Sequence, residues 1–403
     1  MRPFINHILL LLLVTGLWSC RKAYNPPITT NDYAYLVVEG VINSGGDTTS
    51  ITLSRTVPIG AATTRRPEAG AKVLIESDQN ITYRLTERDS GRYFIANLNL
   101  PTTNKYRLHI FTASGKEYES DFVENKISPP VDTITHSFTS HSVQFYVSSH
   151  DPTKSTRYYR WEYHEYWSYD SKFPTVLQYK DSAVIGLPVD SDYNHCYRNA
   201  SPTNGIYIST SEKLSEDIVN NVPVNVVEGL SGKLVREYAV EIRQFAITKE
   251  AYTYWQQLKL NTEQLGSIFD KQPTASPTNI HCISTPSEQV IGYVSVSTNT
   301  LKRAFITQAD VPFRVLLLPG EMPPPGSYLD TLSCPVSHLL FDPLPTLPGR
   351  LYQTFNSGQY MPYAFYYNPP TVQIGYNYAP CECVDCRKLG GTNKKPSWWP
   401  YIN

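Results

Sequence analysis

The sequence predicts a mainly β protein built from two β-sandwich-like domains, the second with an inserted helix and a C-terminal tail stapled by disulfides. The 30 tyrosines and 31 prolines favour strands joined by frequent turns, because tyrosine suits the pleated surface of a sheet and proline suits turns. Short β-branched and aromatic runs also recur between clusters of turn residues. At 403 residues, the chain exceeds what one core usually organises, so we expect two domains.

Residues 1–19 are predicted to be a signal peptide. A basic start at Met1-Arg2 precedes a short apolar run from Ile8 to Leu17, which is well below the roughly 20 residues of a spanning helix. Leu17 and Ser19 lie three positions and one position before Cys20, and this spacing resembles the lipobox of bacterial lipoproteins. The resemblance implies cleavage before Cys20 and lipidation of its thiol, with an acyl chain such as palmitate. The alternative is an ordinary cleaved signal followed by a chance cysteine.

Residues 20–31 are predicted to be a lipidated tether. Their prolines, in Asn25-Pro26-Pro27, are typical of a short extended linker. One acyl chain holds a protein only marginally, whereas the two or three chains of a bacterial lipoprotein anchor it stably in the bilayer. No aspartate follows Cys20 to suggest retention in the inner membrane. We therefore expect a lipid anchor in the outer membrane. The protein can lie on either the periplasmic or the surface side of that membrane.

The first domain is predicted over residues 32–130. Residues 35–42 and 50–55 are two strand-like runs separated by a Gly-rich turn, which indicates a β-hairpin. Further strand-like runs follow at residues 72–76, 82–85, 92–95 and 106–110. Together Gly70–Ile75, Gly91–Tyr93 and Lys105–Leu108 resemble the transthyretin-like or carboxypeptidase-regulatory sandwich, a module that often acts as an adaptor.

The second domain is predicted over residues 131–403, because Pro129-Pro130 interrupts the strand pattern. Strand-like runs resume at residues 142–147, 159–164, 238–242 and 290–294. A helix is expected near residues 249–261. Thr248 can cap it, and its apolar side chains recur with helical spacing at Ala251, Tyr254, Trp255 and Leu258. After residue 311 the abundant prolines favour irregular structure, and the aromatic tail at residues 381–403 is expected to dock on the body.

Besides Cys20, the chain has six cysteines, and in an exported protein an even number favours disulfides. The disulfide candidates are Cys196, Cys282, Cys334, Cys381, Cys383 and Cys386. Because the last three are too close together to pair easily among themselves, at least one should reach back to an earlier cysteine. A zinc site that uses the Cys383-x-x-Cys386 spacing with Cys381 or His281 is the less favoured alternative, as are free thiols.

Sequence motifs give no catalytic residue, cofactor site or metal site. The chain has no His-Glu-x-x-His, Gly-x-Ser-x-Gly or phosphate-binding Gly-Lys-Ser/Thr motif, so we do not expect an enzyme. A net charge of −1 lacks the basic excess that nucleic-acid binding requires. The aromatic strand at residues 158–169 offers possible binding side chains, although packing in the core is the more frequent role of such a strand. These candidates are Trp161, Tyr163, Tyr166 and Trp167.

Several motifs together resemble the outer-membrane lipoprotein family catalogued as domain of unknown function 4249. Besides the lipobox, they are Val38–Gly40, Gly70–Val73, Cys196-Tyr197, Tyr252–Trp255, Ile268–Pro273, Gly292-Tyr293 and Cys383–Arg387. The resemblance implies a lipoprotein encoded beside TonB-dependent transporters, without assigned catalytic residues. The leading hypothesis is therefore a non-enzymatic accessory that binds a ligand or partners a TonB-dependent transporter. A structural or adhesive surface module is the alternative, and a glycan-active enzyme is the third possibility.

Overall fold

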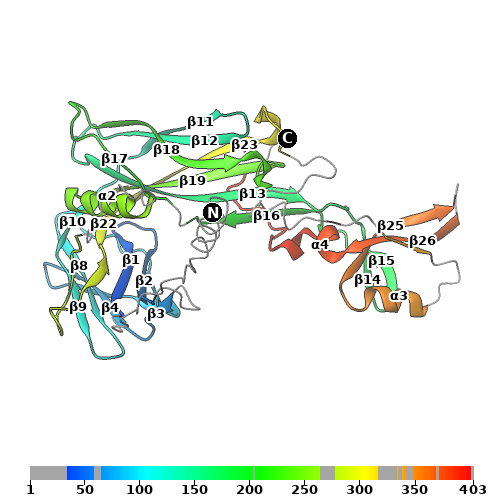
Figure 1. Ribbon diagram of the computed structural model, residues 1–403, viewed down its shortest axis with the longest axis horizontal. Helices are drawn as coiled ribbons and strands as arrows, with labels where there is room; N and C mark the ends of the chain where they lie inside the picture. Colours follow the sequence, from blue (N-terminus) through cyan, green and yellow to red (C-terminus); the bar gives the residue numbers. More distant parts are fainter. Residues whose placement is uncertain are drawn as a thin grey trace, which may run out of the picture.

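In the computed structural model (Figure 1), the structure describes residues 34–58, 65–202, 205–263, 277–315, 334, 338–341, 348–368 and 372–400. The predicted signal peptide, Cys20, the tether and the motif Ile268–Pro273 lie outside these residues. Within the part of the chain that is described, no helix has the length and apolar character needed to cross a bilayer.

The first body is a sandwich of two sheets that share one strand. One sheet contains β1 (Leu36–Asn43), β2 (Thr49–Arg55), β3 (Arg66–Pro67), β6 (Thr86–Asp89), β7 (Arg92–Ile95), β21 (Val290–Gly292) and β22 (Ser295–Ser297). The other contains β4 (Lys72–Ser77), β5 (Thr82–Arg84), β8 (Lys105–Phe111), β9 (Glu117–Ser120) and β20 (Ile280–Cys282). Strand β10 (Val123–Lys126) joins them by pairing with β22 and with β8.

The core of the first body lies between its two sheets. Leu36 and Ile51 enter it from one sheet and Val73 and Leu108 from the other, and all four side chains are fully buried. The predicted hairpin is present, since β1 pairs antiparallel with β2. Alternation of apolar and polar residues along these strands therefore places one face of each sheet on a shared core.

The first body does not end at residue 130. Strands β20, β21 and β22, which the sequence analysis placed in the second domain, pair with β9 and with β1 of the first body. Gly292 has a φ of 134°, and a Cβ there would lie 2.2 Å from the carbonyl oxygen of Val38, so only glycine allows this close parallel pairing. The chain thus leaves the first body, builds most of the second, and returns to complete the first.

The second body is a sandwich of a three-stranded and a five-stranded sheet (Figure 1). The smaller sheet contains β11 (Val131–Phe138), β12 (Ser142–His150) and β18 (Ile218–Glu228), and the larger contains β13 (Tyr158–Asp170), β16 (His195–Ala200), β17 (Tyr207–Thr210), β19 (Glu237–Ala246) and β23 (Asn299–Thr307). Two short 3-10 helices, η1 (Gly229–Ser231) and η2 (Gln308–Asp310), follow β18 and β23. The buried side chains of both sheets form one core, as expected for packed sheets.

A buried polar contact ties the linker before β11 to the second body. The side chain of Gln244 is fully buried; its Nε2 donates to the carbonyl oxygen of Pro129 at 2.8 Å and to Ser149 Oγ at 2.9 Å. Its Oε1 accepts from Trp161 Nε1 at 2.8 Å. All polar atoms of this amide thus have partners, which is required of a buried polar group.

Helix α2 (Lys249–Glu263) lies between the two sandwiches (Figure 1). Its N-terminus begins after Thr248, whose Oγ1 accepts from the Ala251 N–H at 3.2 Å, as a capping residue does. Ala251 packs with Phe245 of β19, and Val41 of β1 contacts the same cluster. The helix therefore packs against both bodies and fills the junction between them.

A third, smaller lobe extends from the second sandwich at the right of Figure 1. It contains the strands β14 (Leu177–Lys180), β15 (Ala183–Gly186), β24 (His338–Phe341), β25 (Tyr360–Asn368) and β26 (Val372–Pro380), with the helices α3 (Pro348–Phe355) and α4 (Cys381–Val384) and the 3-10 helix η4 (Cys386–Leu389). Strands β24, β26 and β25 form one sheet. The abundant prolines after residue 311 predicted irregular structure, and that prediction is wrong for the strands and helices of this lobe.

Two disulfides connect the C-terminal segment to earlier parts of the chain. Cys196 of β16 bonds to Cys386, and Cys334 bonds to Cys383. Cys282 is a buried free thiol in the first core and Cys381 is a half-buried free thiol. The predicted staple between tail and body is therefore confirmed, whereas two of the six candidate cysteines do not take part in it.

The tail docks on the second sandwich as expected. Trp399 is buried, and its Nε1 donates to Glu237 Oε2 at 3.0 Å. Trp398 lies under the guanidinium of Arg303 at 4.1 Å and against the Tyr166 ring at 4.7 Å. The mainly β fold with two sandwiches, an inserted helix and a stapled tail is thus confirmed, with the small lobe as an addition.

Candidate ligand cleft at the junction of the sandwiches

A cleft of about 930 Å³ opens where the two sandwiches and helix α2 meet. The first body contributes the outward face of β1 and its neighbours, including Glu39, Thr52 and Arg92. These three are aligned across the sheet, since Glu39 pairs with Thr52 and Thr52 with Arg92. Ligand sites occur preferentially at domain junctions of this kind, because two bodies supply convergent walls.

Strand β13 forms the opposite wall through alternate side chains. Arg160, Glu162 and His164 line the cleft, and a spacing of two residues places them on one face of the strand. Helix α2 closes the site with Trp255, Leu258 and further side chains of the same face. Regular elements therefore supply most of the walls, whereas Arg65, Ser201 and Tyr293 come from connecting segments.

Arg160 is held rigidly in this wall. Its guanidinium lies over the Trp255 ring at 4.1 Å from the centroid, and its Nη2 donates to Glu162 Oε1 at 2.6 Å. Only 12% of the side chain is exposed. Its Nη1 is buried, and no acceptor for it is found among the described residues. A buried donor without a partner costs about 1–3 kcal/mol, so this nitrogen marks a place where an acceptor would stabilise the structure.

Arg65 shows the same feature on the side of the first body. Its Nε and Nη2 are buried and find no acceptor within the described part of the chain, and Arg65 also lines the cleft. Arg92 forms no ion pair with any described carboxylate. Two of the cleft carboxylates are already engaged, because Glu162 pairs with Arg160 and Glu263 pairs with Lys259 at 3.2 Å. Uncompensated positive charge therefore exceeds the charge of the remaining carboxylate, Glu39.

Aromatic hydroxyls and one histidine supply the other polar groups of the cleft. Burial, assisted by the charge of Glu39, raises the pKa of Tyr254 to about 12. Its hydroxyl therefore stays protonated at neutral pH. Burial and, next, the charge of Arg243 lower the pKa of His164, so its ring is neutral at neutral pH.

His164 forms the one contact in the described cleft that resembles a nucleophile and its base. Its Nδ1 lies 2.6 Å from Ser201 Oγ. A nucleophile of this kind needs a third group that orients the base. The carboxylates that neighbour His164 along and across the sheet are Glu162 and Glu241, and these pair with Arg160 and with Arg303 at 2.6 Å. In the described part of the cleft, the serine and the histidine thus lack the third member of a triad.

The four aromatic candidates from the sequence have different roles. Trp161 and Trp167 belong to the core of the second sandwich, with 2% and 3% exposure, so they are structural, although Trp161 also borders the cleft floor. Tyr166 packs on Trp398 of the tail. Tyr163 borders the cleft, but its side chain lies on the core face of β13, where it contacts the Tyr207 ring at 5.5 Å. None of the four candidates therefore presents its ring to the cleft.

Sequence reasoning missed Arg65, Arg160 and Trp255 as site residues. A usable signal was an arginine within an aromatic strand, since Arg160 alternates with Tyr159 and Trp161 and an arginine there must stack on a ring or find an acceptor. Arg65 carries no such signal, because only tertiary contacts bring it to the cleft.

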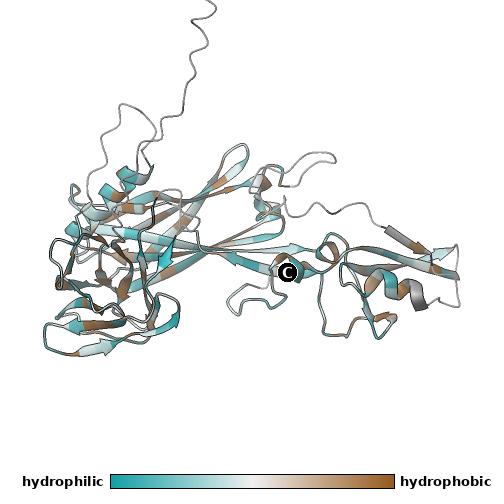
Figure 2. Ribbon diagram, turned by 60° about the horizontal axis from the view of Figure 1, so that its bottom comes forward, coloured by the Kyte–Doolittle hydropathy of each residue, from teal (hydrophilic) through white to brown (hydrophobic). Residues whose placement is uncertain are grey.

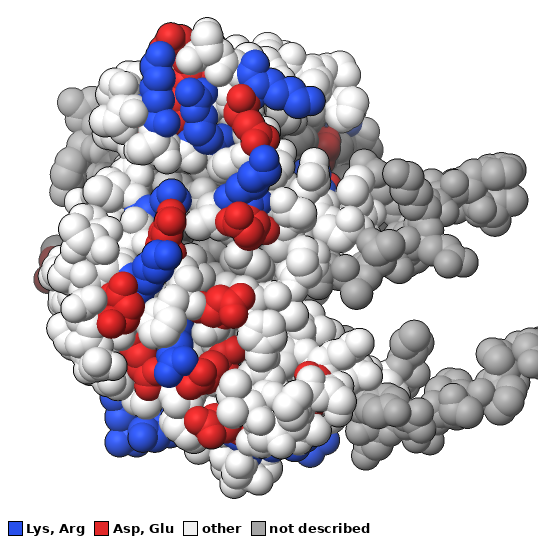
Figure 3. Space-filling model, turned by 90° about the vertical axis from the view of Figure 1, so that its left-hand side faces the viewer, with Lys and Arg blue, Asp and Glu red and all other residues white. Residues whose placement is uncertain are grey.

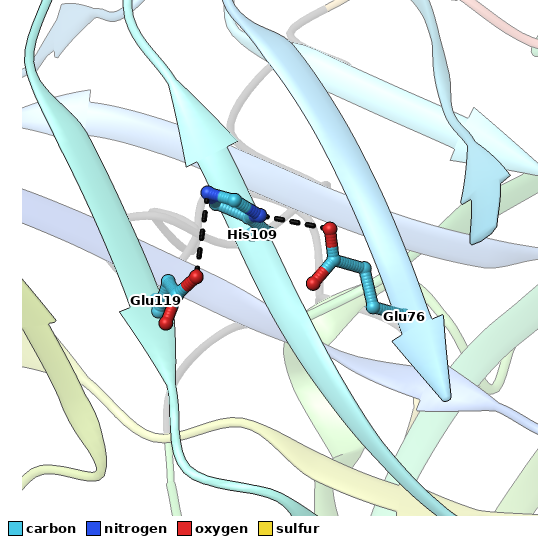
Figure 4. Close-up of side chains that lie close together, drawn as sticks. All are labelled: Glu76, His109 and Glu119. Carbon is cyan, nitrogen blue, oxygen red and sulfur yellow. Dashed lines mark hydrogen bonds and ion pairs between the residues drawn. The ribbon is translucent and has the colours of Figure 1, made fainter. Parts of the chain in front are cut away.

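A second cluster joins β4, β8 and β9 of the first body. His109 Nδ1 lies 2.8 Å from Glu76 Oε1, and Nε2 lies 2.8 Å from Glu117 Oε1 and 3.5 Å from Glu119 Oε1. Figure 4 shows the histidine between Glu76 and Glu119. One histidine nitrogen with carboxylates is a donor set that fits a divalent metal. However, Arg107 already pairs with Glu76 and with Glu119 at 2.8 and 2.6 Å, so the network is compensated by the protein's own cations.

The cluster predicts a pH-dependent contribution to stability. Burial works to raise the pKa of Glu76, but hydrogen bonds from His109 and Arg107 outweigh it and lower the pKa. Because the folded pKa lies below the unfolded one, the stabilisation is complete above about pH 4.5 and is lost as the pH falls through the folded pKa. Glu76→Gln should cost about 1 kcal/mol at pH 7 and flatten the acid limb of a pH-dependent unfolding curve, whereas Asp89→Asn should leave that limb unchanged. An unaltered limb in Glu76→Gln would contradict the assignment.

The surface charges alternate in sign on the face shown in Figure 3. Lys and Arg side chains are interspersed there with Asp and Glu, in line with the net charge of −1. Such a face creates little long-range field. Recognition on it depends on shape and on local contacts.

The third lobe carries a different surface. Among the described residues, seven of the 17 exposed large hydrophobic side chains belong to this lobe or to the segments beside its strands: Val176, Ile185, Val189, Tyr352, Phe365, Tyr366 and Tyr367. Figure 2 shows hydrophobic residues along its helix and strands. The hairpin of β25 and β26 has no charged residue in either strand. Exposed apolar groups that gather in this way typically mark an interaction site.

Comparison with known proteins identifies one family model. The model described as "Domain of unknown function (DUF4249)" matches residues 21–303. A search of curated proteins gives no match.

Two solved structures show a distant likeness. The first, a two fibronectin type-III domain segment from chicken tenascin, is 13% identical and has a TM-score of 0.14, and the match covers 51% of this chain and 88% of that one. The second, the Yersinia pseudotuberculosis adhesin InvE, is 13% identical and has a TM-score of 0.16, and the match covers 53% of this chain and 55% of that one.

Proposed function

The chain belongs to the family described as a domain of unknown function (DUF4249), and from this premise we propose that it is a non-enzymatic, lipid-anchored accessory protein of the outer membrane. In this role it binds a ligand in the junction cleft and partners a TonB-dependent transporter. The observation that carries the proposal is the cleft itself, in which arginines from both sandwiches have buried N–H groups without an acceptor among the described residues.

The position of the anchor supports the accessory role. If Cys20 carries the acyl chains, the chain from Cys20 to Ala34 spans at most about 50 Å, since an extended chain covers roughly 3.3–3.6 Å per residue. The folded bodies therefore stay close to the membrane, within reach of a membrane-embedded partner. The charge-free hairpin of β25 and β26 offers the apolar surface that a protein partner would cover.

Replacing Cys20 with alanine tests the anchor and the partnership together. The wild-type chain should incorporate labelled palmitate, fractionate with the outer membrane and, after gentle solubilisation, recover a β-barrel transporter. Cys20→Ala should lose the label and appear in the soluble fraction, because a peripheral protein without acyl chains has no comparable hold on the bilayer.

Cys282→Ala is the matched control, since it removes a cysteine of the first core that should carry no lipid. Membrane retention of Cys20→Ala would overturn the anchor. Recovery of no barrel with the wild-type chain would overturn the partnership.

A structural or adhesive surface module is the second candidate, and the exposed aromatic side chains of the third lobe favour it. In that role the sandwiches act as spacers and Tyr352, Tyr366 and Tyr367 make the contacts. Protease shaving of intact cells separates the two candidates. Full protection of the chain would exclude surface adhesion and leave an accessory that faces the periplasm.

A further inference from the structure

We infer that the junction cleft binds a small carboxylate whose acid group is attached to a ring, either an aromatic acid or an acidic sugar. The inference rests on the proposed ligand-binding role of the cleft and adds the chemical class of the ligand. Three observations support it: the charge balance of the cleft, the buried arginine N–H groups without an acceptor among the described residues, and the aromatic side chains that line the walls.

The charge balance of the cleft selects an anion. The ionisable groups that line it are Glu39, Arg65, Arg92, Arg160, Glu162, His164 and Glu263. Glu162 and Glu263 are paired within the protein, and His164 is neutral at neutral pH. Arg65 and Arg92 lack a carboxylate partner among the described residues, and Glu39 alone opposes them.

The orphaned donors select a planar acceptor. Arg65 has two buried nitrogens, Nε and Nη2, without an acceptor in the described structure, and these two form one edge of the guanidinium. Such an edge matches the two oxygens of a carboxylate, with which arginine forms two parallel hydrogen bonds. Arg160 adds a third orphaned nitrogen, Nη1. A neutral ligand would satisfy these donors without compensating their charge.

The aromatic walls select a ring. Tyr254 and Tyr293 line the cleft together with Trp255 of α2. Their hydroxyls and faces suit a ring that stacks on one side and accepts or donates hydrogen bonds at its rim, as sugars and aromatic acids do. One hydroxyl-bearing neighbour, Thr262, lies on the same helix face as Trp255.

Binding of two carboxylates and their neutral analogues tests this inference. The probes are phenylacetate against phenylacetamide and digalacturonate against its methyl ester, measured by calorimetry and by tryptophan fluorescence on the full chain. At least one carboxylate should bind about tenfold or more tightly than its neutral analogue, and which pair responds distinguishes an aromatic acid from an acidic sugar. Equal binding of acid and analogue, or no binding of either acid at millimolar concentration, overturns the inference.

Two arginine variants locate the site. Arg65→Gln and Arg160→Gln should each weaken binding of the responding acid by about tenfold or more, since each removes a charge-assisted hydrogen bond. The matched control is Arg88→Gln, because Arg88 also stacks on a ring, Phe94 at 5.4 Å, but lies outside the cleft. Its affinity should equal that of the wild type. Unchanged affinity in both cleft variants overturns the site.

Two separate measurements distinguish a lost binding site from an unfolded variant and from failure of the proposed transporter partnership. Thermal unfolding identifies a destabilised Arg160→Gln, and Arg65→Gln then decides, because Arg65 is less enclosed by the second sandwich. Co-purification of the transporter is measured separately. Loss of acid binding with a retained transporter therefore overturns this inference alone.

Discussion

Replacing Asp151 with alanine should lower the free energy of unfolding of the second sandwich by about 3–5 kcal/mol. Asp151 is 6% exposed and follows β12. Its Oδ1 accepts from the N–H and Oγ1 of Thr153 at 2.9 and 2.7 Å. Its Oδ2 accepts from the N–H and hydroxyl groups of Ser155 and Thr156 at 2.8–3.0 Å. Removal of the carboxylate would leave six donors without their acceptor, three of them in the backbone. Chemical denaturation of the full chain measures the loss.

The same carboxylate predicts an acid dependence. Burial works to raise the pKa of Asp151, but hydrogen bonds from Thr153, Thr156 and Ser155 outweigh it and hold the pKa well below its usual range. Its contribution is therefore complete above the unfolded pKa of about 3.9 and is lost as the pH falls towards the folded pKa.

Asp151→Asn should be less destabilising than Asp151→Ala, because one oxygen remains, and it should lack the acid dependence. The exposed Asp190→Ala is the control and should change stability by less than about 0.5 kcal/mol. A loss of that small size in Asp151→Ala would contradict the role given to the carboxylate.

Removing the Cys196–Cys386 disulfide should lower the free energy of unfolding by a comparable amount. The bond joins residues 190 positions apart in the sequence, and by the chain-entropy estimate a crosslink across a loop of that length contributes about 5 kcal/mol. The double variant Cys196→Ser with Cys386→Ser should therefore unfold at a markedly lower temperature. It should also expose the tail to protease, since Tyr169 donates to the carbonyl oxygen of Cys386 at 2.8 Å and this contact depends on the docked position.

Differential scanning calorimetry and limited proteolysis of the oxidised protein measure these two effects. Cys381→Ser is the matched control, because Cys381 lies in the same segment but is a free thiol. A double variant with wild-type melting temperature and wild-type protease resistance would show that packing alone holds the tail.

Local patterns predicted much of the fold. The hairpin of β1 and β2 follows from alternation around a turn, and helix α2 follows from its cap and from apolar spacing between Ala251 and Leu258. Both signals lie within a few residues of the element that they specify. The cysteine spacing at residues 381–386 likewise indicated bonds to distant partners.

Features that depend on distant pairing were not predictable. Strands β20, β21 and β22 are only three residues long each, and nothing in such short runs identifies the first body as their partner. The aromatic strand β13 carries large side chains on both faces, and alternation alone does not tell which face meets a core, a tail or a cleft. Burial of Trp161 and Trp167 was decided by the packing of two sheets.

The sequence by itself determined the β class, the two sandwiches, the inserted helix and the family resemblance, because strand period, capping and motifs are properties of neighbouring residues. Only the tertiary structure decided which cysteines pair, where the first body ends, and that Arg65 and Arg160 line one cleft. These outcomes depend on contacts between distant segments, such as β1, β13 and α2 in the cleft and the disulfide partners 49 and 190 positions apart. The free energy of such contacts arises only when the bodies pack together. The residues of a single segment therefore do not predict them.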